Sequence, residues 1–69
     1  MKRLEECKEY YKDLYLNVLE ANGFEMNIFD CVELAQYNAH RETLEFVYGA
    51  EFDKTEKTWQ SEALREFYK

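Results

Sequence analysis

The sequence contains no proline and only two glycines, Gly23 and Gly49. Chains that remain disordered are usually rich in both residues and poor in aromatic side chains. Here 17% of the residues are aromatic, so the chain is expected to fold. Its 69 residues leave room for a single domain, residues 1–69, and a domain of this size needs dense apolar packing or a partner to be stable.

Long apolar runs are also missing. The longest uninterrupted run contains three residues, so no segment is expected to span a membrane. The N-terminal residues are charged and lack the apolar block of a signal peptide, which predicts a soluble, cytoplasmic protein.

Basic residues are scarce. The chain has 15 acidic residues against 9 basic ones, and its formal net charge at pH 7 is −6. Proteins bind nucleic acids largely through Lys and Arg side chains that neutralise phosphates, so direct nucleic-acid binding is not expected. An acidic protein is instead attracted to a basic surface on another protein.

A regular apolar pattern predicts a helix over residues 2–22. Apolar residues recur there at steps of three and four, which is typical of a helix that packs along one seam against another helix. The seam contains Leu4, Cys7, Tyr11, Leu14, Val18 and Ala21. Gly23 follows, and glycine commonly ends a helix because it adopts the left-handed conformation without strain.

A second helix is predicted over residues 28–48, with Asn27 as its N-cap, Asp30 in its first turn and Gly49 at its end. It has apolar stripes on two nearly opposite sides, so we expect it to be buried on both sides as the central helix. The first stripe, expected to face the seam of the first helix, contains Ile28, Val32, Ala35, Ala39, Thr43 and Phe46. The second stripe contains Phe29, Tyr37, Leu44, Val47 and Tyr48, with Leu34 at its edge.

The last segment predicts a third helix over residues 54–68. Asp53 and Glu56 have the spacing of an N-cap followed by an acid, and Trp59, Ala63 and Phe67 recur every four residues. The predicted fold class is therefore all-α, a three-helix bundle in which the third helix covers the second stripe. An α+β fold with a short hairpin near residues 43–53 is the alternative, because that stretch contains β-forming residues and Gly49.

No arrangement of side chains indicates catalysis. Two cysteines and one histidine are fewer than a disulfide scaffold or a zinc site needs, and Cys7 and Cys31 would lie roughly 15 Å apart in antiparallel helices. His40 lies on the opposite side of its helix from Cys31, and Glu33 and Tyr37 beside it are too few ligands for a metal. Glycine-rich phosphate-binding motifs are absent. The sequence predicts a non-enzymatic protein with no metal and no cofactor.

Acidic residues are concentrated on one side of the first two predicted helices. No Lys or Arg occurs between Lys12 and Arg41, whereas five acids do. Exposed helices usually mix both signs of charge, so a face of one sign is either a solubility surface or a docking surface for a basic partner. The candidate partner-binding residues are Glu6, Glu9, Asp13, Leu16, Glu20, Glu33 and Tyr37. Leu16, Tyr10 and Tyr37 are the expected apolar anchors.

The function predicted from these features is that of a small protein-binding inhibitor or modulator that occupies a basic cleft, including one made for nucleic acid. By analogy of size and charge alone, such proteins include phage-encoded anti-CRISPR and anti-restriction antagonists. The alternative is a homodimeric helical adaptor in which the first two helices pair across a two-fold axis. A helix-turn-helix DNA-binding protein is disfavoured, since its recognition helix would lack Lys and Arg.

Overall fold

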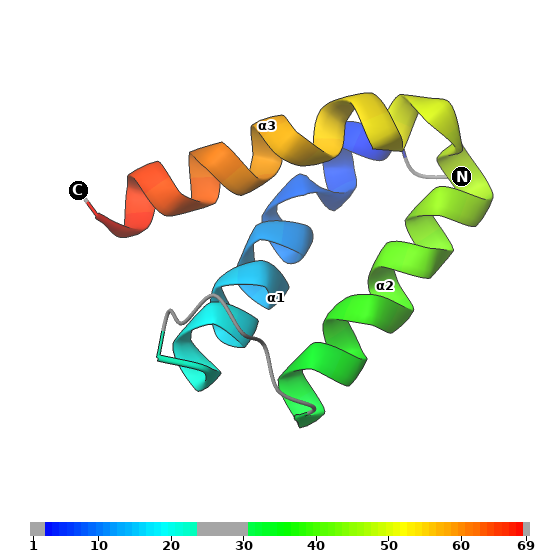
Figure 1. Cartoon of the computed structure of the whole chain (residues 1–69). Coiled ribbons are helices and arrows are strands. Elements are labelled where there is room, and N and C mark those ends of the chain that lie inside the picture. Colours follow the sequence, from blue (N-terminus) through cyan, green and yellow to red (C-terminus); the bar gives the residue numbers. More distant parts are fainter. Residues whose placement is uncertain (1–2, 24–30, 69) are drawn as a thin grey trace.

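The computed structural model describes residues 3–23 and 31–68, and within these ranges the chain is helical (Figure 1). A short 3₁₀ helix, η1 (Leu4–Cys7), leads into α1 (Lys8–Ala21), which is followed by α2 (Val32–Tyr48) and α3 (Ala50–Phe67). The prediction of an all-α three-helix bundle is confirmed. The hairpin near residues 43–53 is wrong, because this stretch forms the end of α2 and the start of α3.

The ends of α1 and α2 confirm the two glycine stop signals. Gly23 and Gly49 both have positive φ, 63° and 57° respectively. The predicted helix over residues 2–22 differs only at its start, where one 3₁₀ turn precedes the α-helix. In that turn Glu6 accepts a hydrogen bond from the backbone N–H of Arg3.

The second helix begins later than the sequence predicts. Its N-cap is Cys31, whose sulfur accepts a hydrogen bond from the backbone N–H of Leu34, and the first helical residue is Val32. The predicted helix therefore does not run unbroken through Cys31, and its predicted start, Ile28, lies outside the described residues. The proposed N-cap Asn27 and its neighbour Asp30 lie outside the described residues.

The third helix begins earlier than predicted, and Asp53 is not its N-cap. Gly49 ends α2 and starts α3: its N–H donates to the carbonyl of Glu45, and its own carbonyl accepts from the N–H groups of Phe52 and Asp53. One residue with positive φ thus turns the chain, so no linker separates the two helices. This places Phe52 inside the bundle.

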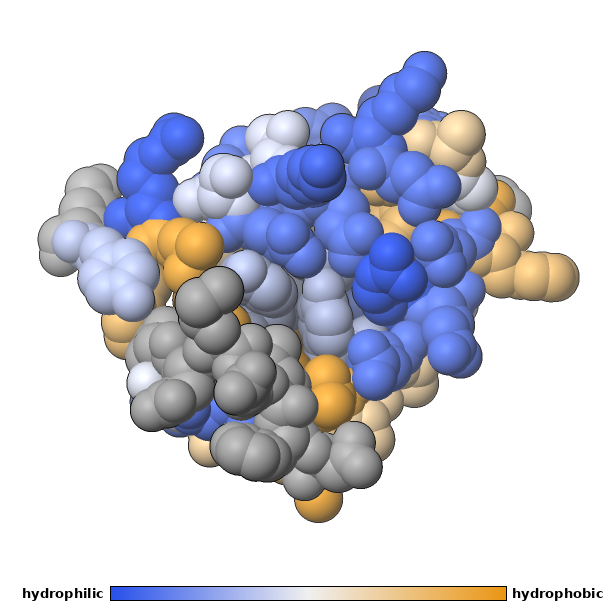
Figure 2. Space-filling view, in the orientation of Figure 1, coloured by the Kyte–Doolittle hydropathy of each residue, from blue (hydrophilic) through white to orange (hydrophobic). Residues whose placement is uncertain are grey.

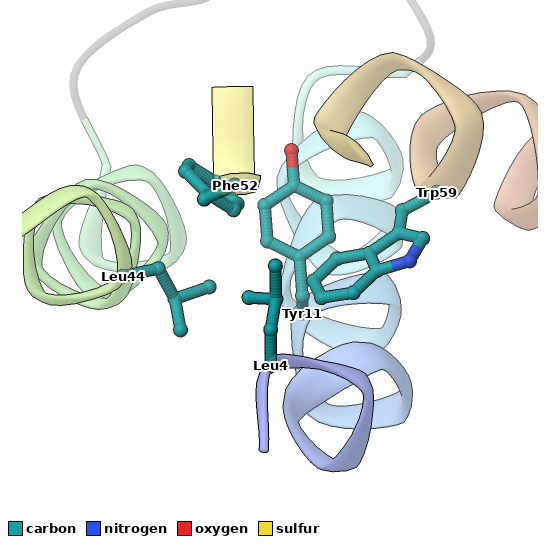
Figure 3. Packing of buried hydrophobic residues seen from close by; sticks show 5 residues of the cluster. All are labelled: Leu4, Tyr11, Leu44, Phe52 and Trp59. Atoms are coloured by element: carbon teal, nitrogen blue, oxygen red, sulfur yellow. The ribbon is translucent and has the colours of Figure 1, made fainter. Parts of the chain in front are cut away.

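Tyr11 of α1 lies at the centre of the core and is completely buried (Figure 3). Its ring centroid is 5.8 Å from that of Phe52 and 5.4 Å from that of Trp59. Leu4 and Leu44 complete this cluster from η1 and α2. The predicted seam of α1 is therefore confirmed at Tyr11, which lies in the core and is surrounded by side chains from every helix.

The helices share this core unequally. α1 packs against both α2 and α3, whereas α2 and α3 pack less against each other. In Figure 1, α1 and α2 run side by side in opposite directions and α3 crosses the N-terminal part of α1. The helix that packs most against both of the others is therefore α1, whereas the sequence predicts α2 as the central helix.

The two apolar stripes of α2 differ in how far they are buried. In the second stripe, Leu44 is buried and Tyr37, Tyr48 and Leu34 are half-buried, so its predicted burial is confirmed at these residues. It is wrong at Val47, which is 41% exposed, and Phe29 lies outside the described residues. In the first stripe, by contrast, every described residue is exposed, and the prediction that this stripe packs against α1 is wrong. The exposed residues are Val32, Ala35, Ala39, Thr43 and Phe46, while Ile28 lies outside the described residues.

Candidate protein-binding surfaces

A polar network in the core decides which face of α2 turns inward. The hydroxyl of Tyr11 donates to Oε2 of Glu56 at 2.7 Å and lies 2.7 Å from the hydroxyl of Tyr37. The amide of Gln60 donates to both hydroxyls, at 3.1 and 3.3 Å. Arg41 donates to both carboxylate oxygens of Glu56, at 2.8 and 3.2 Å. These five side chains join all three helices.

The network also fixes the protonation states of its members. Burial raises the pKa of Tyr11, and its hydrogen bonds with Tyr37 and Glu56 raise it further, so this phenol stays neutral. Burial likewise raises the pKa of Tyr37. Burial on its own would raise the pKa of Glu56, but the hydrogen bonds from Arg41 and Tyr11 outweigh it, so the pKa is lowered and the carboxylate is charged. An ion pair that is partly withdrawn from water is tolerated best when its remaining polar atoms are also hydrogen-bonded, as the second oxygen of Glu56 is here.

Tyr37 therefore has a different position from the one proposed. The sequence suggests it as an apolar anchor on a docking surface, but its hydroxyl faces the interior and its ring packs against Tyr11 with the centroids 5.5 Å apart. In this position Tyr37 holds α2 against α1. Of the other two proposed anchors on α1, Leu16 is half-buried and Tyr10 is exposed.

The basic residues of α1 point toward α3. Lys8 forms an ion pair with Glu62 at 2.6 Å, and Lys12 donates to Glu66 at 2.8 Å. Lys12 is only 2% exposed. Its hydrogen bond with Glu66 raises the pKa of Lys12 although burial acts in the opposite direction, so the ammonium is charged. Both cations of α1 are thus neutralised by α3.

The opposite side of α1 is left with acids. The exposed acids there are Glu9, Asp13 and Glu20 of α1 and Glu6 of η1, directly before it. The side chain of Glu9 is 79% exposed, and its ion pair with Lys12 is a long one of 3.7 Å. We call these four residues the acidic face of α1. The structure brings together here four of the seven residues that the sequence suggests.

A shallow groove extends this face onto α2. It has a volume of about 380 Å³ and is lined by Asn17, Glu20 and Ala21 of α1 and by Glu33 and Gln36 of α2. Two carboxylates therefore border a polar groove between neighbouring helices. Glu33, another of the suggested residues, lies beside the acidic face in this way.

The remaining chemistry-bearing side chains are scattered. His40 packs edge-on against Tyr10, with the ring centroids 4.7 Å apart, and its buried Nε2 atom has no hydrogen-bond partner among the described residues. Cys7 and Cys31 are half-buried thiols, the first near the hydroxyl of Tyr48 and the second near the amide of Asn22.

Two kinds of feature, a metal-binding cluster and a membrane-spanning helix, are absent from the described ranges, residues 3–23 and 31–68. They contain no group of three or more His, Cys, Asp or Glu side chains that could hold a metal ion. No helix in them combines the length and the apolar character needed to cross a membrane. Comparison with family models, with curated proteins and with solved structures finds no match to this chain.

Sequence reasoning missed two features of these surfaces. One is the inward direction of Lys8 and Lys12, which depends on Glu62 and Glu66 more than fifty residues away. The other is the exposure of the first stripe of α2, whose apolar residues resemble a buried face. The polar residues Arg41, Glu56 and Gln60 were the available signal, because together they can satisfy buried tyrosine hydroxyls.

Proposed function

We propose that this protein is a non-enzymatic binding module that docks a basic surface of another protein through the acidic face of α1. The observation that supports this most is the separation of charge on α1. Its acids Glu9, Asp13 and Glu20 are exposed, whereas its cations Lys8 and Lys12 are paired with α3. Steering between a negative and a positive surface accelerates association and excludes like-charged partners.

The shape of the face suits a basic groove. Residues Glu9–Glu20 follow α1 for eleven residues, which corresponds to about 16 Å along the helix. A row of carboxylates on a rigid rod presents its charges at fixed spacing, and the groove beside Glu20 and Glu33 offers room for a Lys or Arg side chain of the partner. The specific form that we propose is inhibition of a nucleic-acid-binding protein, in which this row occupies the site of the phosphates.

The test is affinity capture from lysate of the native cell with the wild-type chain and a triple charge reversal, Glu9→Lys, Asp13→Lys and Glu20→Lys. The reversal is expected to weaken binding of the captured partner at least about a hundredfold, since several charged contacts become repulsive. Partner binding should also weaken steeply as salt is added and should be displaced by nucleic acid.

A matched control reverses three exposed acids elsewhere, Glu5→Lys, Glu51→Lys and Asp53→Lys, with the same change in net charge. It should retain binding. Equal loss in both triple variants would show that only net charge matters, and unchanged binding in the α1 variant would reduce the acidic face to a solubility surface. Circular dichroism confirms that each variant is folded.

A further inference from the structure

We infer that the exposed stripe of α2 is the interface of a homodimer in which two α2 helices pack antiparallel across a two-fold axis at Ala39. The stripe consists of Val32, Ala35, Ala39, Thr43 and Phe46. This surface is separate from the acidic face of α1, so the inference does not depend on the proposed function.

The stripe exposes large apolar side chains to water, whereas the solvent-facing side of a helix is usually polar. Phe46 is 93% exposed and Val32 is 69% exposed. In Figure 2, tan and orange spheres mark apolar residues along the outer edge on the right, where α2 lies. Exposed aromatic side chains beside small residues are typical of interfaces, in which a large side chain on one partner fills the space above small ones on the other.

The charge pattern favours a second copy as the occupant. Two copies with a net charge of −6 repel one another, so they can associate only through a face without charge. None of the five stripe residues is charged, although 35% of the chain is. A basic partner would gain nothing at this stripe, whereas a second copy would bury it with the least repulsion.

The stripe is also symmetric about one residue. Val32 and Phe46 lie seven residues on either side of Ala39, and Ala35 and Thr43 lie four residues on either side. In an antiparallel pair centred on Ala39, each Phe46 lies opposite Val32 of the second copy, and the small residues between them let the helix axes approach to about 8 Å. A two-fold interface requires such self-complementarity.

Polar residues along the two edges fit the same arrangement. Gln36 and Glu42 flank the stripe on opposite sides and are both exposed. By helix geometry, Gln36 lies near Thr43 of the second copy, and Glu42 lies near its Asn38, an amide that can donate to the carboxylate. One helix face on each side makes a small interface, so the expected dissociation constant is micromolar.

The first experiment is sedimentation equilibrium of the full chain from micromolar to millimolar concentration. The mass should rise from 8.4 kDa toward twice that value. Phe46→Glu should stay monomeric and folded by circular dichroism, whereas Thr58→Glu, which adds the same charge at an exposed position of α3, should dimerise like the wild type. A wild-type chain that is monomeric throughout, or a dimer that survives Phe46→Glu, overturns the inference.

A second experiment tests the axis. In a Cys7→Ala, Cys31→Ser background, Ala39→Cys should cross-link to itself with a short bismaleimide, because residue 39 faces its own copy. Val32→Cys, which keeps Phe46, should not, since the two copies of residue 32 would lie about 21 Å apart along the helices. Cross-linking at residue 32, or none at residue 39, overturns the antiparallel arrangement.

Discussion

The acidic face of α1 and the uncharged stripe of α2 are both exposed helix surfaces, yet they arise for opposite reasons. On α1, the cations Lys8 and Lys12 are drawn to α3, and the acids are left outside. On α2, the polar network turns Tyr37 and Arg41 inward, and an apolar stripe is left outside. The comparison teaches that in a small core the pairing of a few polar groups can decide which surface remains for partners.

The largest expected effect separates two phenylalanines. Phe52 is completely buried, so Phe52→Ala should cost about 3–5 kcal/mol of unfolding free energy. Phe46 is almost fully exposed, so Phe46→Ala should change it by less than about 0.5 kcal/mol. Urea unfolding at a concentration well below the expected dissociation constant of the dimer, followed by Trp59 fluorescence, measures both. Equal losses would mean that the stripe of α2 is part of the core.

The next effect concerns the centre of the polar network. Glu56→Ala leaves Arg41 and two tyrosine hydroxyls without their shared acceptor, so it should cost about 2–4 kcal/mol. Urea unfolding is again the measurement. Glu51→Ala removes an exposed acid from the first turn of the same helix and should cost less than about 1 kcal/mol. If both variants lose the same stability, the network does not orient α2.

The pH dependence of stability tests the same network. The pKa of Tyr11 and that of Tyr37 are raised in the folded protein, so their contribution is complete below about pH 10, the ordinary tyrosine pKa, and is lost as pH rises beyond it. The pKa of Glu56 is lowered, so its contribution is present above about pH 4 and is lost as pH falls through the folded pKa.

Thermal unfolding between about pH 2 and pH 11 measures both the loss of stability at acid pH and the loss at alkaline pH, because this range includes the ordinary pKa values of Glu and Tyr. Tyr37→Phe should flatten the alkaline arm, because the variant has one raised phenol fewer. An alkaline arm that is unchanged in Tyr37→Phe would contradict the burial of its hydroxyl.

The smallest effect sharpens the charge separation on α1. Glu66→Gln removes the principal acceptor of Lys12, so the ammonium can turn toward Glu9 and partly neutralise the acidic face. Affinity for a basic partner should fall by less than about fivefold. Isothermal titration calorimetry measures this change. Gln36→Glu, at the edge of the groove beside the face, should instead raise the affinity slightly, and a gain of affinity in Glu66→Gln would contradict the separation.

Local patterns were enough to predict the helices of this fold. The seam from Leu4 to Val18 and the positive φ of Gly23 and Gly49 follow from neighbouring residues, and so do three exposed acids of α1. The start of α3 was missed because Gly49 serves two helices and replaces a side-chain cap.

The inward face of α2 could not be predicted locally, because both of its stripes are apolar. Tyr37 turns inward since Glu56 and Gln60, about twenty residues later in the sequence, bind its hydroxyl. The same long separation hides the pairing of Lys12 with Glu66. The acidic face was predictable as a set of acids, whereas the pairing of the neighbouring cations Lys8 and Lys12 with α3 was not.

The most direct test of the account is a nuclear magnetic resonance titration with a lysine-rich peptide as a model basic surface. Amide shifts should change most around Glu9, Asp13, Glu20 and Glu33 and should be lost in the triple reversal on α1. They should leave the amides of Ala35, Ala39, Thr43 and Phe46, which belong to the exposed stripe of α2, nearly unchanged. Changes spread evenly over the acids of α3, or largest on the stripe of α2, would contradict the separation of the two surfaces.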